Sequence, residues 1–162
     1  RIYTNGFLFK EKIGDRKLNI SAIKKHSEID ICDYQNLKNG KDYKLENGEI
    51  IPNKNLTLDP LKPLSYAFCS DTSYKENIVP IIKNVDLLYH ETTFLEDKKD
   101  LAKKTKHSTA QEAAKIAKLA DVNKLIIGHY SSRYKDIEAF KTEAQEVFQN
   151  TELAIEGLTF EL

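Results

Sequence analysis

The sequence predicts an α/β fold, in which a sheet carries helices on one face and follows a smaller N-terminal elaboration. Residues 65–162 alternate between short apolar runs, typical of buried strands, and longer segments with helical periodicity. Residues 1–64 lack this alternation and contain several turn-forming segments. We therefore expect a single unit over residues 1–162, with 65–162 as its core and 1–64 as an added strand, short helix and hairpin.

Three apolar runs are expected to form the central strands of the core. Each is rich in aliphatic and aromatic residues and is bounded by polar or turn residues. They are residues 65–70 (SYAFCS), 85–90 (VDLLYH) and 124–130 (KLIIGHY).

Helices are expected between and after these strands. Residues 73–84 place three isoleucines on one helical face, although Pro80 would shorten or kink that helix. Residues 107–122 form the clearest helix, because two capping boxes overlap at its start: Ser108 with Gln111, and Thr109 with Glu112. Residues 136–148 repeat apolar side chains at helical spacing, and 152–162 are expected to close the chain as a strand or hairpin.

The N-terminal part is expected to contain four elements. Residues 6–9 read as a strand and 18–26 as a short helix. Residues 43–51 read as a hairpin whose Asn47-Gly48 suits a type I′ turn. The prolines of residues 52–63 predict an extended crossing segment, since proline removes a donor and disfavours helix before it.

Composition narrows the functional classes. Lys plus Arg total 25 and Asp plus Glu total 25, so any affinity for nucleic acid must come from a local patch. The separated Cys32 and Cys69 favour free thiols in a reducing, cytoplasmic setting. No apolar run approaches the roughly 20 residues that cross a membrane. The chain starts at Arg1 and contains no methionine, so we expect a processed piece or a fragment.

Chemically active residues follow each predicted core strand. Asp71 follows the first, Glu91 the second, and His129 the third, where Ser131 and Arg133 come next. Ligands of α/β sheets gather beyond the carboxyl ends of the strands, so these side chains are expected on one rim. His107, at the start of the best-capped helix, is expected to join them.

Each of these residues also has a structural interpretation. Asp71 could cap a following helix, and His90 could be a satisfied core histidine. Glu91 could remain solvated, and Arg133 could be an ordinary surface arginine. The convergence of several such groups favours a site. Asp and His suit Zn²⁺, Mn²⁺ or Fe, and Arg with a serine hydroxyl suits a phosphate oxygen. The leading hypothesis is therefore metal-assisted attack on a phosphodiester.

Four ordered motifs carry a resemblance to a known family. FCSDT, HETTF, HSTAQEA and GHYSSRY, in this order and spacing, resemble the carboxyl-terminal half of ribonuclease Z. That family comprises metallo-β-lactamase-fold endonucleases that remove the 3′ trailer of precursor tRNA. The similarity runs from about Gly6 to Leu162. It implies half of an αββα sandwich, with a mixed sheet, helices on one face and an N-terminal arm.

The resemblance also implies roles for the residues of the rim. Asp71 looks like the carboxylate that bridges two zinc ions, and His129 like a terminal ligand of one of them. Glu91 and His107 resemble the pair in which the acid orients the histidine, which protonates the leaving 3′ oxygen.

The substrate-binding residues are implied in the same way. Ser131 and Arg133 resemble the pair that holds the scissile phosphate. Residues 16–19 (RKLN) resemble a loop near the 3′ end of the substrate, which makes Arg16, Lys17 and Asn19 candidate tRNA contacts.

The chain departs from the family in two places. The His-x-His-x-Asp-His signature is absent, and zinc needs about four ligands, so we expect the other half of the same protein to complete a two-zinc site. Residues 29–50 correspond to the family's arm but lack its glycine-proline turn. The implied partners are precursor tRNA, the missing N-terminal half and a second copy in a homodimer. The isolated chain is expected to be inactive.

Two other functions stay open at this stage. One is a related metallo-β-lactamase-fold phosphodiesterase that acts on small esters. The other is a non-catalytic RNA-binding or interaction half that completes the site of a partner.

Overall fold

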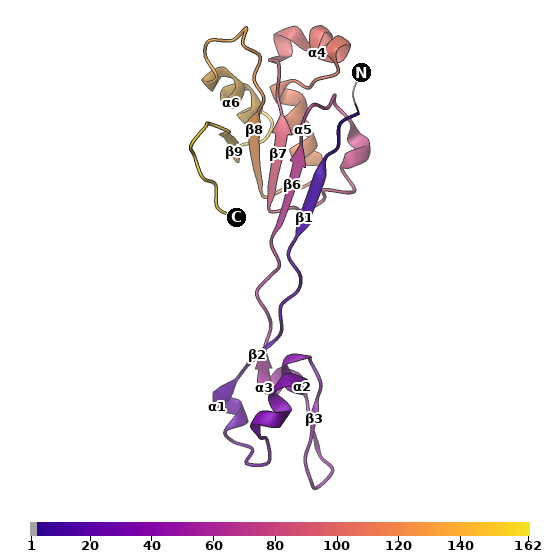
Figure 1. Cartoon of the computed structure of the whole chain (residues 1–162), viewed down its shortest axis with the longest axis vertical. Coiled ribbons are helices and arrows are strands. Elements are labelled where there is room, and N and C mark those ends of the chain that lie inside the picture. Colours follow the sequence, from indigo (N-terminus) through magenta and orange to yellow (C-terminus); the bar gives the residue numbers. More distant parts are fainter. Residues whose placement is uncertain (1–2) are drawn as a thin grey trace. The chain divides into compact units, whose positions relative to one another are not determined.

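A computed structural model of the chain describes residues 3–162, and its contacts divide it into two compact units. The core unit comprises Arg1–Lys10 with Leu64–Leu162, and the arm unit comprises Glu11–Pro63 (Figure 1). The division lies inside the stretch that we expected to be one elaboration, because residues 7–10 join the sheet of the core. That the whole chain behaves as a single unit stays a prediction.

The core unit is built on a five-stranded mixed sheet with the order β1-β6-β7-β8-β9. Strand β1 is antiparallel to β6, and the other neighbours are parallel. The three predicted central strands are confirmed, and the closing segment contributes only its first residues as a strand. The bounds are β1 (Phe7–Lys10), β6 (Ser65–Cys69), β7 (Leu87–Glu91), β8 (Lys124–Gly128) and β9 (Thr151–Leu153).

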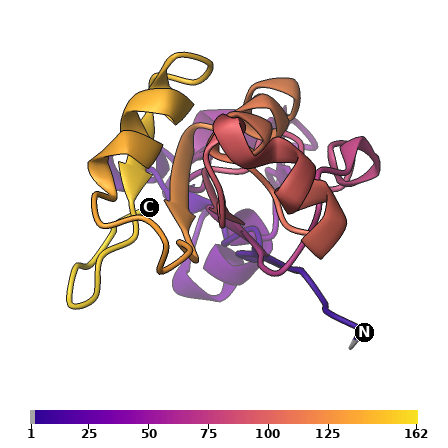
Figure 2. The same ribbon diagram turned by 90° about the horizontal axis from the view of Figure 1, so that it is seen from above.

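Helices α5 (Ala110–Leu119) and α6 (Glu138–Gln145) cover one face of this sheet (Figure 2). Because side chains alternate along a strand, every second residue of the sheet meets these helices. The shared core consists of small and aliphatic side chains from both layers, among them Ala67, Leu88, Leu125, Ala113 and Phe140. This packing confirms helices on one face and holds the carboxyl ends of the parallel strands at one edge.

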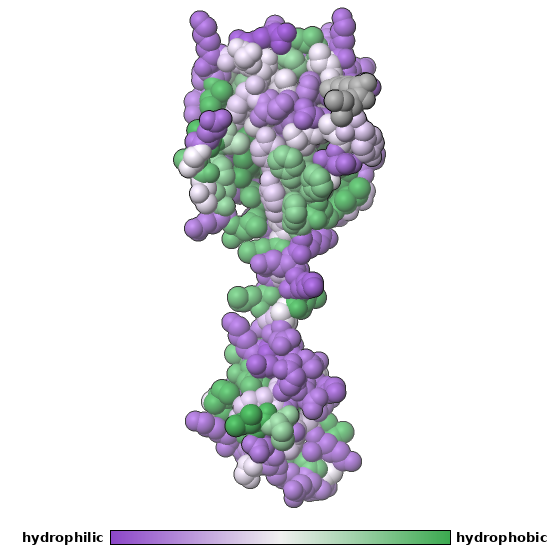
Figure 3. All heavy atoms as spheres, in the orientation of Figure 1, coloured by the Kyte–Doolittle hydropathy of each residue, from purple (hydrophilic) through white to green (hydrophobic). Residues whose placement is uncertain are grey.

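The opposite face of the sheet carries aromatic side chains. The strand register places Phe7, Phe68, Tyr89 and Ile126 in one row across it. Phe68 and Tyr89 stack with ring centroids 4.7 Å apart. Phe7 is 55% exposed, and Figure 3 shows hydrophobic side chains gathered over β1 and β6 on this face. One face of the sheet is therefore covered by helices and the other is open over these strands.

The connections of the core unit differ from expectation in two places. The helix expected over residues 73–84 is wrong: only a 3₁₀ turn, η2 (Glu76–Ile78), forms there. Pro80 lacks the amide hydrogen that a longer helix would need. After β7 the chain forms η3 (Glu96–Lys98) and α4 (Lys99–Thr105), a helix that the sequence analysis did not predict.

The arm unit is small and is built from short elements around a core of five aliphatic residues. That core consists of Ile23, Ile29, Leu37, Ile51 and Leu56. The elements are β2 (Lys17–Leu18), α1 (Ile20–Ile23), η1 (Ile31–Asp33), α2 (Tyr34–Lys38), β3 (Tyr43–Lys44), β4 (Ile50–Ile51), α3 (Asn53–Leu56) and β5 (Thr57–Leu58). The predicted short helix and hairpin are confirmed.

Two details of the arm unit were wrongly predicted. The hairpin does not use a type I′ turn, because Gly48 has a positive φ and Asn47 does not. Its loop closes instead with a hydrogen bond from the Gly48 amide to the Leu45 carbonyl. Residues 52–63 are not wholly extended, since the helix α3 lies within them.

None of the helices within residues 3–162 combines the length and apolar character needed to cross a membrane.

Candidate functional site

The ends of the three central strands bring the expected site residues to one edge of the sheet. Asp71 lies two residues beyond β6, Glu91 is the last residue of β7, and His129 directly follows β8. Asp71 and His129 both have left-handed backbones, with φ of 49° and 65°. Such conformations are costly for residues other than glycine and persist where the surrounding structure holds them, as at functional sites.

Asp71 and His129 face each other, as a shared metal would require. The carboxylate Oδ1 of Asp71 lies 3.4 Å from Nε2 of His129, and both side chains are about half exposed. A third donor, from His107, joins them, and the ligand atoms of the three residues lie within 4.8 Å of one another. The sequence analysis assigned only Asp71 and His129 to the metal. The structure therefore adds His107 to the set of donors that could reach an ion.

Glu91 is fully buried and binds His107. Its Oε1 lies 2.8 Å from Nδ1 of His107, whose side chain is 18% exposed. Because Nδ1 is engaged by the carboxylate, Nε2 is the nitrogen that remains to face the open side of the site. The alternative of a solvated Glu91 is wrong, since no part of its side chain reaches solvent.

Thr93 connects this pair to His129. The Thr93 hydroxyl donates to Oε2 of Glu91 at 2.8 Å and lies 2.9 Å from Nδ1 of His129. Because that hydroxyl hydrogen points at the carboxylate, its oxygen is left to accept the Nδ1–H of His129, and Nε2 is then free to face Asp71. The Thr93 amide also donates to Glu91, at 2.9 Å. A carboxylate, a hydroxyl and an imidazole thus form a continuous chain of hydrogen bonds.

The sequence analysis missed Thr93. The available signal was its place in HETTF, two positions after Glu91 and one before an apolar residue. Residues two apart on an extended backbone share a side, so a hydroxyl there could have been expected to reach the carboxylate.

His107 is held by the connection between α4 and α5. The left-handed Lys106, with φ of 60°, ends α4, and the His107 amide then donates to the Ala102 carbonyl at 2.9 Å. The Ser108 hydroxyl donates to the Thr72 carbonyl at 2.7 Å, which ties this connection to the segment after β6. Of the two expected capping boxes, the one with Thr109 and Glu112 is confirmed, and Ser108 does not act as a cap.

Two structural interpretations can now be decided. The side chain of Asp71 caps no helix, because residues 72–75 are not helical. His90 is a core histidine that is satisfied at one ring nitrogen: it is fully buried and its Nδ1 lies 2.8 Å from the Glu91 carbonyl, whereas its Nε2 has no hydrogen-bond partner among the described residues. Burial lowers the pKa of His90 below its ordinary value, which keeps the ring neutral.

Gly128 gives the backbone the room that it needs beside the site. A Cβ atom at this position would lie 2.6 Å from the hydroxyl oxygen of Tyr89. The close approach of the Tyr89 ring is therefore possible only because residue 128 has no side chain. Burial also raises the pKa of the Tyr89 hydroxyl, and the negative charges of Glu91 and Asp71 add to the increase.

Ser131 and Arg133 follow His129 in an exposed loop. The Ser131 amide donates to the Thr93 carbonyl at 3.1 Å, so the start of this loop is tied to the same segment as the histidine. Nη1 of Arg133 donates to the Ser131 hydroxyl at 3.3 Å. The two residues thus contact each other beside His129, which is compatible with binding one anion together.

The three candidate tRNA contacts lie in the arm unit. Nε of Arg16 donates to the Thr57 hydroxyl at 2.7 Å, and its guanidinium pairs with Asp59. The side chain of Asn19 caps α1 by accepting from the Ala22 amide at 3.2 Å. Lys17 is exposed. Two of the three therefore have structural partners, and tRNA contact by these residues stays a prediction.

The donor set fits a metal ion of the zinc type. One carboxylate and two imidazoles are ligands that zinc accepts, and carboxylate–histidine pairs commonly orient such ligands. Three donors leave coordination positions for water, substrate or residues outside this chain.

Known proteins resemble the chain over its whole length. A comparison with protein-family models finds no match. The chain is 48% identical over 162 residues to "Ribonuclease Z" of Porphyromonas gingivalis strain W83, which covers all of this chain and 53% of that protein. It is 48% identical over 161 residues to "Ribonuclease Z" of Cytophaga hutchinsonii, which covers 99% of this chain and 51% of that protein. The chain thus spans about half the length of the curated relatives it matches.

Solved structures support the fold. The metallo-beta-lactamase fold protein YhfI from Bacillus subtilis matches with a TM-score of 0.57 and 27% identity, over 60% of this chain and 40% of that protein. A long form RNase Z from yeast matches with a TM-score of 0.54 and 25% identity, over 60% of this chain and 13% of that protein. The mixed sheet with helices on one face is therefore part of a metallo-β-lactamase fold. Together, the sequence relatives and this fold show that the chain is similar to about half the length of ribonuclease Z and has part of a metallo-β-lactamase fold.

Proposed function

We propose that this chain is one half of a zinc-dependent endoribonuclease that removes the 3′ trailer of precursor tRNA. The observation that carries the proposal is the cluster of Asp71, His129 and His107, backed by the buried carboxylate of Glu91. The similarity to ribonuclease Z at 48% identity supports the reaction class.

Each of these residues would have a distinct role in the reaction. Asp71 and His129 would hold zinc, which when bound supplies a Lewis acid that activates water and polarises the phosphodiester. His107, oriented through Nδ1 by Glu91, presents Nε2 to the open side, where it can give a proton to the leaving 3′ oxygen. Arg133 and Ser131 would bind the scissile phosphate through charge-assisted hydrogen bonds.

We further propose that the other half of the same protein completes the site. With His107 as the proton donor, the described residues offer Asp71 and His129 as close ligands, fewer than two zinc ions require. The aromatic face of the sheet, with Phe7 and Phe9 more than half exposed, is a suitable surface for a second layer. The free thiols of Cys32 and Cys69 fit the proposed cytoplasmic location. A homodimer belongs to the same proposal.

The proposal can be tested with precursor tRNA and zinc. The chain alone should not cleave at enzymatic rates, whereas a fusion with the unmatched segment of the Porphyromonas gingivalis protein should. Cleavage by the chain alone would overturn the half-site proposal. No cleavage by a folded, zinc-loaded fusion, together with turnover of a chromogenic phosphodiester, would favour the small-ester phosphodiesterase.

His107→Ala in the fusion separates catalysis from metal binding. As a proton donor, His107 should be needed for turnover, while the zinc content measured by atomic absorption stays unchanged. Loss of zinc would show that it acts as a ligand, and unchanged turnover would favour a non-catalytic role for the chain. His26→Ala, a histidine of the arm unit, is the matched control and should leave both quantities unchanged.

A further inference from the structure

A cavity of about 440 Å³ opens beside Asp71 in the core unit. This volume falls within the range of pockets that bind small molecules. The roles proposed above use only Asp71 among its lining residues. The others are Tyr3, Thr4, Thr72, Ser73, Lys75 and Lys106.

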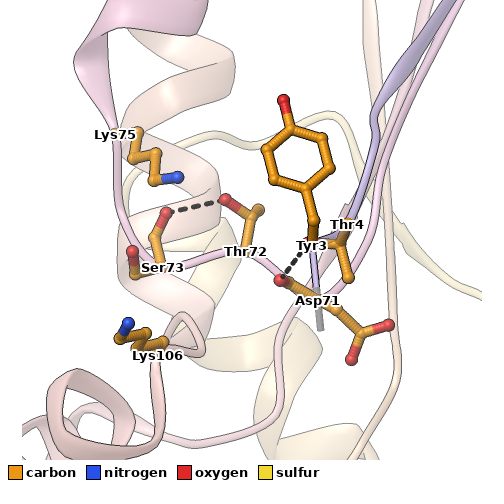
Figure 4. Close-up of a pocket in the computed structure, with 7 residues that line it drawn as sticks. All are labelled: Tyr3, Thr4, Asp71, Thr72, Ser73, Lys75 and Lys106. Atoms are coloured by element: carbon orange, nitrogen blue, oxygen red, sulfur yellow. Dashed lines mark hydrogen bonds between the residues drawn. The ribbon is translucent and has the colours of Figure 1, made fainter. Parts of the chain in front are cut away.

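The polar groups of this cavity suit a phosphate and a ribose. Lys75 and Lys106 contribute two ammonium groups, which bind phosphate as point charges. Ser73 lies between them, and Thr72 lies between Ser73 and Tyr3 (Figure 4). The Thr72 hydroxyl donates to the Ser73 carbonyl at 3.0 Å, so its oxygen can still accept a hydrogen bond, for example from a ribose 2′-hydroxyl.

The remaining wall suits a base. The Tyr3 side chain lies across the cavity from the two lysines (Figure 4) and is 86% exposed. An exposed aromatic ring beside positive charge is a stacking platform that accepts any base. The Asp71 carboxylate points away from the lysines and does not fill the space between ring and ammonium groups (Figure 4). Its Oδ1 lies 3.4 Å from Nε2 of His129.

The backbone places both lysines at the edge of the catalytic cluster. Lys106 is the left-handed residue that ends α4 and immediately precedes His107. Lys75 follows the segment that leaves Asp71, and Thr4 binds that segment by donating to the Asp71 carbonyl at 3.2 Å. A phosphate held here would therefore be adjacent to the cluster of Asp71, His107 and His129.

We propose that this cavity is a nucleotide subsite for single-stranded RNA, with phosphate on Lys75 and Lys106 and a base on Tyr3. The inference rests on the proposed function, to which it adds the site of a nucleotide next to the scissile bond. A subsite of this kind binds any sequence, because neither the ammonium groups nor the ring reads base edges.

The first experiment tests whether the charges of Lys75 and Lys106 bind phosphate. It measures the binding of a fluorescein-labelled single-stranded hexaribonucleotide by anisotropy at several KCl concentrations. The double variant Lys75→Gln, Lys106→Gln should bind more weakly. The slope of log K against log[KCl] should become shallower by about 0.7, because one phosphate of the strand is no longer neutralised by the protein. The control variant replaces two exposed lysines that do not line the cavity, Lys83→Gln and Lys118→Gln. Its affinity and its salt slope should equal those of the wild type. Equal slopes for the two double variants would overturn the proposal.

Variants of Tyr3 test the stacking. Tyr3→Leu should weaken binding about tenfold without changing the salt slope, and Tyr3→Phe should restore it. Adenosine 5′-monophosphate should displace the oligonucleotide at lower concentrations than adenosine or inorganic phosphate. Wild-type affinity of Tyr3→Leu would overturn the assignment of the base.

These measurements do not depend on cleavage. If the fusion fails to cleave precursor tRNA but the lysine and tyrosine variants lose oligonucleotide binding, the proposed function fails and the subsite stands. If the fusion cleaves and the variants bind normally, the subsite fails alone.

Discussion

The two sides of the site are built differently. On the inner side, Glu91, Thr93 and His107 are buried or nearly so and are connected by hydrogen bonds of 2.8 to 2.9 Å. On the outer side, Asp71 is half exposed and Arg133 is exposed, with a hydrogen bond from Arg133 to Ser131 at 3.3 Å. The inner groups are thus oriented before any ligand arrives, whereas the outer groups are free to meet an ion or a phosphate.

This difference has an energetic consequence. A buried charge that loses its partner costs several kcal/mol, while an exposed charge contributes little to stability. Changes on the inner side should therefore lower the free energy of unfolding and impair the site together. Changes on the outer side should impair binding alone.

The largest effect is expected for Glu91→Ala. Removal of the carboxylate leaves Nδ1 of His107 and the Thr93 amide without their buried acceptor, and should cost about 3 kcal/mol. Urea unfolding followed by circular dichroism measures it. Glu152→Ala, which removes the exposed partner of Lys141, is the control and should cost less than about 0.5 kcal/mol. Similar losses in the two variants would show that the inner side does not stabilise the fold.

Gly128→Ala should cause the second largest loss of stability and lower the free energy of unfolding by about 2 kcal/mol. The added Cβ would lie 2.6 Å from the Tyr89 hydroxyl oxygen. The measurement is thermal unfolding of single and double variants. If crowding by Tyr89 is the cause, Gly128→Ala should cost less in a Tyr89→Leu background, which removes the hydroxyl oxygen and the ring carbon that lie closest and leaves Cβ of Ala154 at 3.1 Å. Additive losses would contradict that cause.

Thr93→Val should lower the free energy of unfolding by about 1 kcal/mol. Valine keeps the shape of the threonine side chain but removes the hydroxyl that connects Glu91 with His129. The zinc affinity of the fusion that carries Thr93→Val, measured by competition with a chromogenic chelator, should fall roughly tenfold or more. Thr93→Ser should restore it. Thr92→Val, which removes a hydroxyl that donates to the Gly128 carbonyl at 3.2 Å, should leave zinc affinity unchanged. An equal loss in both valine variants would place Thr93 outside the site.

Arg133→Ala should have the smallest effect on stability, below about 0.5 kcal/mol, because the side chain is exposed. It should nevertheless weaken RNA binding and make the salt slope shallower by about 0.7. Lys118→Gln is the control. A large loss of stability in Arg133→Ala would contradict the separation of the two sides.

The elements of the core could largely be predicted from local signals. The apolar runs of the three central strands and the Thr109 capping box each depend on a few neighbouring residues, and all are confirmed. Helix α4 was missed because residues 99–105 include three lysines and no apolar periodicity. The helix expected over residues 73–84 did not form, because its apolar spacing was outweighed by Pro80.

The candidate site could also be predicted only in part from the sequence. The sequence was sufficient to place Asp71, Glu91 and His129 after consecutive strands, since parallel strands deliver their carboxyl ends to one edge. The order of the motifs was sufficient to suggest the family. These conclusions depend on chain order and on local periodicity, which a sequence contains in full.

Only the tertiary structure decided which atoms meet. It paired Glu91 with His107 across 16 positions, connected Thr93 to His129 across 36, and placed Lys106 beside the loop that carries Lys75. It also decided that residues 7–10 belong to the core sheet. Such contacts depend on strand register and on left-handed turns at Asp71, Lys106 and His129, which arise from packing between distant segments and leave no local pattern in the sequence.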